Sequence, residues 1–184
     1  AKNPRIHTFI STSPVHMKHK LKMGPNAVLE AVGASVTHSR KFVGDVEWSA
    51  EDATRTEFDF LCKCIDVAIQ SGATVINVPD TVGYSHPAEY GELIRRLIEN
   101  IPDSDKVIWS THCHNDLGLA VANSLAGVMN GARQIECTIN GIGERAGNAA
   151  LEEAVMALKV RGDSLPFYTE IVTPKLSRAS KMVS

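Results

Sequence analysis

The stretch HCHNDLG at residues 112–118 contains two histidines that are two positions apart. It ends the apolar run KVIWSTHCH, which is typical of a buried strand. Side chains alternate between the two faces of a strand, so His112 and His114 project to the same side. Two imidazoles held side by side suit a divalent ion such as zinc, manganese or iron. A pair of histidines with ordinary hydrogen bonds is the alternative for an isolated pattern of this kind.

A second candidate is the glycine-rich stretch NGIGERAGN, which begins at Asn140. It links a strand to a helix, so its backbone N–H groups could meet an anion. The side-chain oxygen of Asn148 could reach the same metal as the two histidines. Glu144 and Arg145 inside the stretch are unusual for a plain turn, and an internal ion pair that shapes the loop is the alternative interpretation.

Three further segments carry polar residues at or near strand ends. In VEWSAED, alternation places Glu47, Ser49 and Glu51 on one face. Glu51 is best placed for chemistry, with an exposed position in a helical turn as its alternative, whereas Glu47 lies deeper and suits a structural hydrogen-bond acceptor. Thr81 could bind a substrate carboxylate or belong to an ordinary turn. His7 points toward the same mouth, although a lone histidine in an apolar strand is usually part of the core.

Alternating strands and helices must position these residues. We expect strands at 5–12, 45–50, 73–80, 106–114 and 133–140. We expect helices at 25–41, from a cap at Asp52 or Thr54 to Gly72, from His86-Pro87 to Pro102, at 116–130 and at 147–162. Such repeats predict a parallel sheet covered by helices.

The polar residues gather at the carboxyl ends of the strands, which is the pattern of an active site on the rim of a barrel. An open sheet usually has a Gly-rich turn after its first strand, and STSP stands there instead. A complete barrel needs eight units and about 250 residues. The sequence therefore predicts an α/β fold: about five βα units from the C-terminal part of a TIM (β/α)8 barrel, with the first three strands absent. Residues 1–162 would be this partial catalytic barrel (strands 4 to 8), and residues 163–184 the start of a linker toward an absent C-terminal region.

Composition narrows the class of protein. A net charge of −2 gives no reason to expect a nucleic-acid or membrane-surface partner. No apolar run reaches the roughly 18 residues of a membrane span, and the N-terminus has no signal-peptide pattern. The four cysteines form no CxxC pair, so we expect reduced thiols in a cytoplasmic protein rather than a zinc knuckle.

Several long motifs together resemble one enzyme family. RIHTFISTSPVHMKHKLK, DVEWSAEDATRTE, INVPDTVGYS, WSTHCHNDLGLAVANS and ECTINGIGERAGNAALEE are similar to the alpha-isopropylmalate synthase and homocitrate synthase family, and most of all to its 2-isopropylmalate synthases. The resemblance covers nearly all of residues 5–162. It implies a Claisen condensation of acetyl-CoA with 3-methyl-2-oxobutanoate that gives 2-isopropylmalate and CoA, the first committed step of leucine biosynthesis. It also implies a homodimeric full-length enzyme.

The resemblance assigns roles to the candidate residues. A divalent metal (Mn, Zn or Mg) would bind His112 and His114, with Asn148 in or near its coordination sphere, and would stabilise the developing alkoxide. Glu51 would be the catalytic carboxylate that helps to remove the methyl proton. Thr81 would contact the substrate carboxylate, and His7 and Ser49 would line the substrate pocket.

One family feature is missing. The R-D-G-x-Q type motif, which carries an arginine and an acidic metal ligand, is not in this sequence. We therefore expect this chain alone to be inactive, to bind metal weakly and to have two open sheet edges. The alternatives are a related synthase (methylthioalkylmalate, citramalate or homocitrate), a metal-dependent lyase of the same barrel superfamily, and a non-enzymatic product that folds only with a partner.

Overall fold

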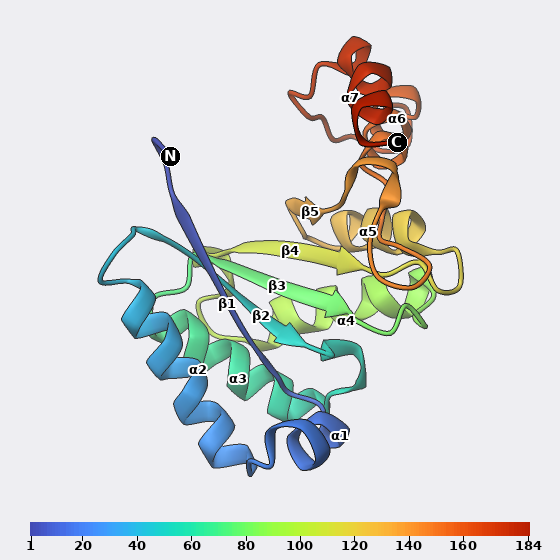
Figure 1. Ribbon diagram of the computed structural model, residues 1–184. Helices are drawn as coiled ribbons and strands as arrows, with labels where there is room; N and C mark the ends of the chain where they lie inside the picture. The colour runs from blue at the N-terminus through green and yellow to red at the C-terminus, as the bar shows by residue number, and fades with distance from the viewer.

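The computed structural model describes residues 1–184 and contains one five-stranded parallel sheet (Figure 1). Its strands are β1 (Arg5–Ser11), β2 (Asp45–Glu51), β3 (Val75–Asp80), β4 (Ile108–Cys113) and β5 (Gln134–Glu136). They lie side by side in the order β1-β2-β3-β4-β5, which is their order along the chain. This confirms the predicted α/β class with a parallel sheet built from successive strand–helix units.

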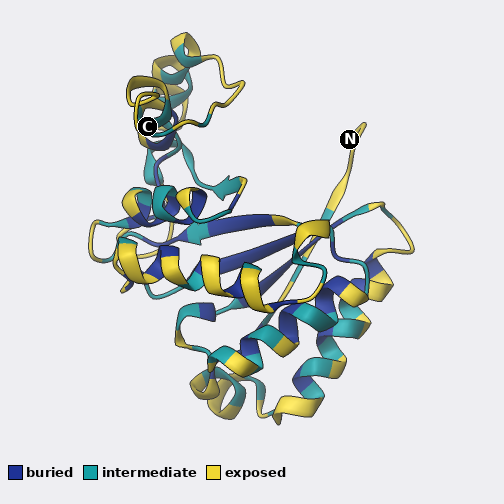
Figure 2. Ribbon diagram, turned by 180° about the vertical axis from the view of Figure 1, so that it is seen from behind, coloured by how far each residue is buried: buried dark blue, intermediate teal, exposed yellow.

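Helices between successive strands cover one face of the sheet, and the last two helices lie beyond β5 (Figures 1 and 2). The α-helices are α1 (Pro14–His16), α2 (Pro25–Ser39), α3 (Phe58–Gln70), α4 (Pro87–Asn100), α5 (Ala120–Met129), α6 (Leu151–Val160) and α7 (Leu176–Val183). The shorter turns are a π-helix η1 (Met17–Leu21) and the 3-10 helices η2 (Ala53–Arg55), η3 (Ser104–Lys106), η4 (Ile139–Gly141) and η5 (Thr173–Lys175). No helix combines the length and apolar composition needed to cross a membrane.

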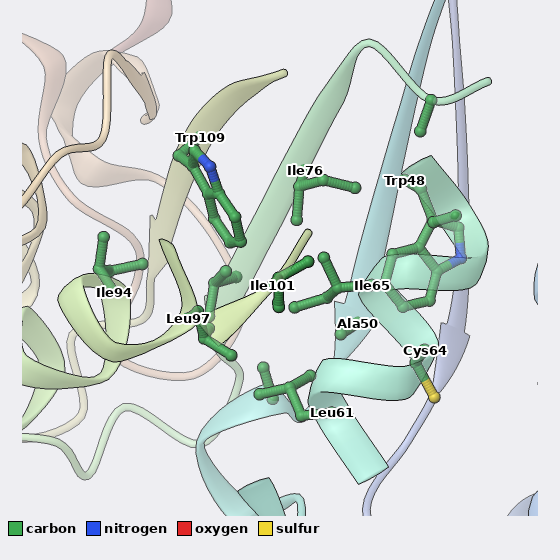
Figure 3. Close-up of a cluster of buried hydrophobic side chains, with 14 of the residues drawn as sticks. Trp48, Ala50, Leu61, Cys64, Ile65, Ile76, Ile94, Leu97, Ile101 and Trp109 are labelled. Carbon is green, nitrogen blue, oxygen red and sulfur yellow. The ribbon is translucent and has the colours of Figure 1, made fainter. Parts of the chain in front are cut away.

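The core lies between the sheet and these helices (Figure 3). On α3, the buried residues Leu61, Cys64, Ile65, Ala68 and Ile69 recur at the spacing of one helical face. They pack in one cluster with alternate residues of the strands, among them Trp48, Ile76 and Trp109. The buried face of the helix and the buried face of the strands therefore meet in one hydrophobic core.

Several predicted boundaries were too wide. The strand expected at 133–140 is only Gln134–Glu136, because the chain turns into η4 at Ile139. The helix expected at 147–162 begins at Leu151. Neither Asp52 nor Thr54 caps α3, whose N-cap is Glu57. Asp52 instead takes a left-handed conformation before η2, and its buried carboxylate binds Arg55.

The segment predicted to begin a linker contains its own structure. Helix α7 contacts η4, where the Asn140 side chain donates to the Ser180 carbonyl at 3.1 Å and accepts from the Ser180 hydroxyl at 2.6 Å. The two outer strands, β1 and β5, each have a neighbour on one side only. The sheet therefore has two open edges, as the sequence led us to expect.

Truncation of Leu61 should test the core. Its side chain is fully buried. Leu61→Ala should therefore lower the free energy of unfolding by about 2–5 kcal/mol in a denaturant titration. Val160→Ala is the matched control, because this residue is 67% exposed. Its truncation should cost less than about 0.5 kcal/mol, and equal losses in the two variants would contradict this assignment of the core.

Candidate active site

The face of the sheet opposite the helices is polar and forms an open cleft of about 460 Å³. Every site residue predicted from the sequence lines it: His7, Ser49, Glu51, Thr81, His112, His114 and Asn148. The other lining residues are Phe9, Asn77, Pro79, Glu136, Gly143 and Glu144. The structure thus brings together residues from all five strands and from the loops that follow them.

A second cavity of about 410 Å³ lies elsewhere, between β5, α6 and residues 166–171. Ten of its 13 lining residues are hydrophobic, and Arg133 is the one charged group among them. It offers little to catalyse a polar reaction. The groups that could do chemistry therefore belong to the cleft on the polar face.

The two histidines face each other across a short gap. His112 lies on β4 and His114 directly after it, and their Nε2 atoms are 3.2 Å apart. His112 Nδ1 lies 2.7 Å from a carboxylate oxygen of Glu136, so this nitrogen carries a hydrogen and donates it. When His112 is neutral, its Nε2 then has no hydrogen and carries a lone pair on the side of His114.

His114 has the same arrangement. Its Nδ1 lies 2.6 Å from the Thr81 carbonyl oxygen, which can only accept a hydrogen bond. Arg145 Nη2, which can only donate, lies 2.7 Å from the same nitrogen and also reaches the Thr81 carbonyl and Asp116. In the tautomer of His114 whose Nδ1 donates to the Thr81 carbonyl, the Nε2 lone pairs of the two neutral rings meet. Such a pair repels unless a proton or a cation lies between them.

Asn148 lines the same cleft as this pair. It forms an isolated antiparallel bridge with His114, and its Nδ2 donates to the Ile142 carbonyl at 3.3 Å. Its Oδ1 is buried and has no hydrogen-bond partner. A Cβ atom at Gly143 would lie 2.8 Å from Asn148 Cγ, so glycine is what gives this side chain its room.

Glu136 is the main residue that the sequence analysis missed. Its carboxylate accepts from His112 Nδ1 and from Asn77 Nδ2, at 2.7 and 3.1 Å. It also lies with His7 and Glu47 in a group whose ligand atoms are within 4.8 Å of one another and could hold a metal ion. The sequence does contain a pattern that indicates Glu136. Gln134 and Glu136 are two positions apart on β5 and therefore share one face, as His112 and His114 do at the end of β4.

Burial and nearby charges shift the pKa values of Glu47 and Glu136 in opposite directions. Glu47 is only 3% exposed, and burial together with the nearby Glu136 raises its pKa to about 7. Burial also opposes the charge on Glu136, but the bond from His112 and the contact with Glu47 outweigh it and lower the pKa. Arg5 and Gln134 already occupy the Glu47 oxygens, at 3.0 Å each. Glu47 is thus a structural acceptor, as predicted, and Glu136 is the anion that faces the cleft.

Glu51 is the last residue of β2, which contradicts the alternative of an exposed helical turn. Its carboxylate accepts from the Ser11 hydroxyl at 2.6 Å and from Lys20 Nζ at 2.6 and 2.7 Å. Burial would raise the pKa of Glu51, but the bonds from Lys20 and Ser11 outweigh it and lower the pKa. Glu51 is therefore ionised near neutrality and able to accept a proton.

Thr81 and Ser49 are held by fixed partners. Thr81 Oγ1 accepts from the Asp52 backbone N–H at 2.9 Å, which leaves its hydroxyl hydrogen available to a ligand. Ser49 Oγ contacts His7 Nε2 at 2.5 Å and accepts from Asn77 Nδ2 at 2.9 Å. Burial lowers the pKa of His7 despite the opposing charge of Glu136.

The ion pair between Glu144 and Arg145, which was the alternative interpretation of this loop, is present but exposed. Glu144 lies 3.5 Å from Arg145 and is 78% exposed. Arg145 instead binds both oxygens of Asp116 at 2.8 Å and the Thr81 carbonyl at 2.9 Å. It therefore joins the loop after β5 to the loops after β3 and β4.

Several curated proteins are similar in sequence to this chain over the whole length of the chain. The chain is 68% identical to a 2-isopropylmalate synthase of Caulobacter vibrioides and 66% identical to one of Bradyrhizobium sp., in each case over 184 residues. These matches take in all of this chain but only 35% of either relative.

Solved structures share the fold at low sequence identity. Hydroxymethylglutaryl-CoA lyase from Pseudomonas aeruginosa matches with a TM-score of 0.80 and 17% identity, over 97% of this chain and 61% of the lyase. The HMG-CoA lyase from Brucella melitensis matches with a TM-score of 0.79 and 16% identity, over 97% of this chain and 65% of the lyase. The sequence itself matches the HMGL-like family over residues 1–183, so this chain belongs to the HMGL-like family.

Proposed function

We propose that this chain forms part of the catalytic barrel of a 2-isopropylmalate synthase, which condenses acetyl-CoA with 3-methyl-2-oxobutanoate. The observation that carries the chemistry is the pair of Nε2 atoms of His112 and His114, in the same cleft as Asn148, whose oxygen has no partner. The choice of substrate is supported by the 68% and 66% identity to proteins of that name.

The residues present fit a divalent metal. Ligand nitrogens that lie about 2.0–2.2 Å from one ion are roughly 3.0–3.5 Å apart at octahedral or tetrahedral angles. The two histidine nitrogens are 3.2 Å apart. Glu136 fixes one imidazole through its other nitrogen, as carboxylates often do for metal ligands. We propose His112, His114 and Asn148 as ligands of Mn, Zn or Mg, which when bound would act as a Lewis acid toward the oxygens of the 2-oxo acid.

The protein groups would carry out the remaining steps. The Thr81 hydroxyl would donate to the carboxylate of the 2-oxo acid, with His7 and Ser49 lining the pocket around it. Glu51 would accept a proton from the methyl group of acetyl-CoA, and the resulting carbon nucleophile would bond to the ketone carbon. Water would then cleave the thioester, releasing CoA and the free carboxylate of 2-isopropylmalate.

We also propose that residues 1–162 are strands 4 to 8 of the barrel and that residues 163–184 begin the connection to a further region. The two open sheet edges support this proposal, as does the fraction of the relatives that the chain covers. An acidic metal ligand and an arginine would then come from other strands, and the isolated chain would be inactive. A homodimer and a cytoplasmic location belong to the same proposal and rest on the resemblance alone.

The substrate proposal is tested in the full-length protein that carries this chain. CoA release from acetyl-CoA should be fastest with 3-methyl-2-oxobutanoate among a panel of 2-oxo acids that includes pyruvate, 2-oxoglutarate and 4-methylthio-2-oxobutanoate. Glu51→Gln should lower kcat by about 100-fold or more, because the glutamine cannot accept the proton. Equal rates across the panel, or cleavage of an added acyl-CoA without condensation, would point to another member of the superfamily.

The metal site is tested by titration calorimetry with Mn²⁺ or Zn²⁺. His112→Ala and His114→Ala should each weaken binding by at least about 100-fold, which is more than the loss of an outer-shell group causes. Glu51→Gln, which changes a cleft residue outside the ligand set, should bind metal as tightly as the unmodified protein. Unchanged affinity in both histidine variants would rule out these ligands.

The glycine beside Asn148 allows a test that leaves all proposed ligands in place. Gly143→Ala would push its Cβ into the Asn148 side chain, so metal affinity should fall by about tenfold. Gly44→Ala is the matched control, because nothing lies within 4 Å of its Cβ position. If both variants bind metal equally well, Asn148 is not held for coordination.

A further inference from the structure

The π-helix η1 brings one lysine to the end of β2. After β1 the chain turns through α1 and η1, and the wide turn closes with Lys22 N–H bonded to the Met17 carbonyl. Lys22 itself has a φ of 54°, which ends the turn. Single π turns are common at functional sites. Here the turn places Lys20 Nζ against the carboxylate of Glu51.

Lys20, Ser11 and Glu51 form a closed hydrogen-bonded set. The Lys20 ammonium has three hydrogens to donate. It has three acceptors, which are Glu51 Oε1 at 2.6 Å, Glu51 Oε2 at 2.7 Å and Ser11 Oγ at 3.2 Å. Ser11 in turn donates to Oε2 at 2.6 Å. Oε2 therefore receives two bonds and Oε1 only one, so Oε1 keeps more free accepting capacity.

The other basic residues of the segment do not share this position. Lys18 and Lys22 form no ion pair with a carboxylate, whereas Lys20 does. The remaining titratable groups near Glu51 are His16 on α1 and Asp52, which follows Glu51 in the chain. The Asp52 carboxylate is bound by Arg55 at 2.8 Å and lies 3.3 Å from His16 Nδ1.

We propose that Lys20 is a positioning residue that holds the Glu51 carboxylate, with Oε1 left to accept the substrate proton. This inference rests on the proposed role of Glu51 as the base. Lys20 acts through Glu51 and does not itself contact the reacting atoms. Without Lys20, the glutamate side chain would sample several rotamers. Holding it in one rotamer before the reaction avoids the entropy cost of ordering it at each turnover.

The same contact sets the charge of the base. Burial favours the neutral form of Glu51, whereas the ammonium and the Ser11 hydroxyl favour the ionised form and prevail. Without Lys20, burial is less opposed and the pKa rises. The carboxylate is then protonated, and unable to act as a base, at pH values where the unmodified protein is active.

Kinetics of the full-length protein test the proposal with Lys20→Met, Lys20→Gln and Lys20→Arg. The two neutral variants should have a kcat that is lower by about tenfold or more. The acid limb of their kcat–pH profile should move to higher pH by about one pH unit. KM for the 2-oxo acid should change by less than about threefold, because Lys20 does not touch it. Lys20→Arg keeps the charge and should restore most of kcat and the original acid limb. Lys18→Met is the matched control and should behave as the unmodified protein.

A carbon-13 NMR titration of labelled glutamate carboxyl groups gives a reading that does not depend on turnover. Glu51→Gln identifies the resonance, whose pKa should rise in Lys20→Gln and stay unchanged in Lys18→Met. An unmoved pKa and acid limb in the Lys20 variants would overturn the proposal, and so would a loss of kcat that Lys20→Arg does not restore. If the unmodified protein condenses no 2-oxo acid, the proposed function fails, and the titration still decides whether Lys20 controls Glu51.

Discussion

The parallel hydrogen-bonded ladder is the constraint on which the rest of this molecule depends. Because successive residues of a strand point to opposite faces, each strand is divided between two environments. On β2, Trp48 and Ala50 enter the core while Ser49 and Glu51 face the cleft. Helices cover one face only, so the core is built on that side and the polar groups are left together on the other.

The polar face is ordered by hydrogen bonds that each leave one atom available. Glu136 accepts a hydrogen bond from Nδ1 of His112, and the Thr81 carbonyl contacts Nδ1 of His114. The Nε2 atoms of the two rings therefore face each other. The Asp52 N–H donates a hydrogen bond to the Thr81 hydroxyl oxygen, so the hydroxyl hydrogen of Thr81 stays available to a ligand. The site is therefore defined as much by the groups that orient the functional atoms as by those atoms themselves.

Much of this arrangement could be predicted from the sequence, because it follows from periodicity. Strand alternation alone was enough to bring His7, Ser49 and His112 into one cleft. Glu136 was missed because the strand was expected to run to 140, which put its polar end at Asn140, whereas β5 ends at Glu136. Lys20 could not have been found, because its position depends on a π-helical turn and not on a regular period. Interactions made between loops are set by tertiary contacts that no local pattern encodes.

The agreement between strand order in the sheet and strand order in the chain has a consequence for how the protein is made. During synthesis from the N-terminus, each new strand can dock on the one completed just before it, and no finished pair has to open to admit a later strand. Contacts of this kind join successive units, so the entropy lost in closing each loop stays that of a single strand–helix crossover. The nascent sheet can therefore grow at one advancing edge.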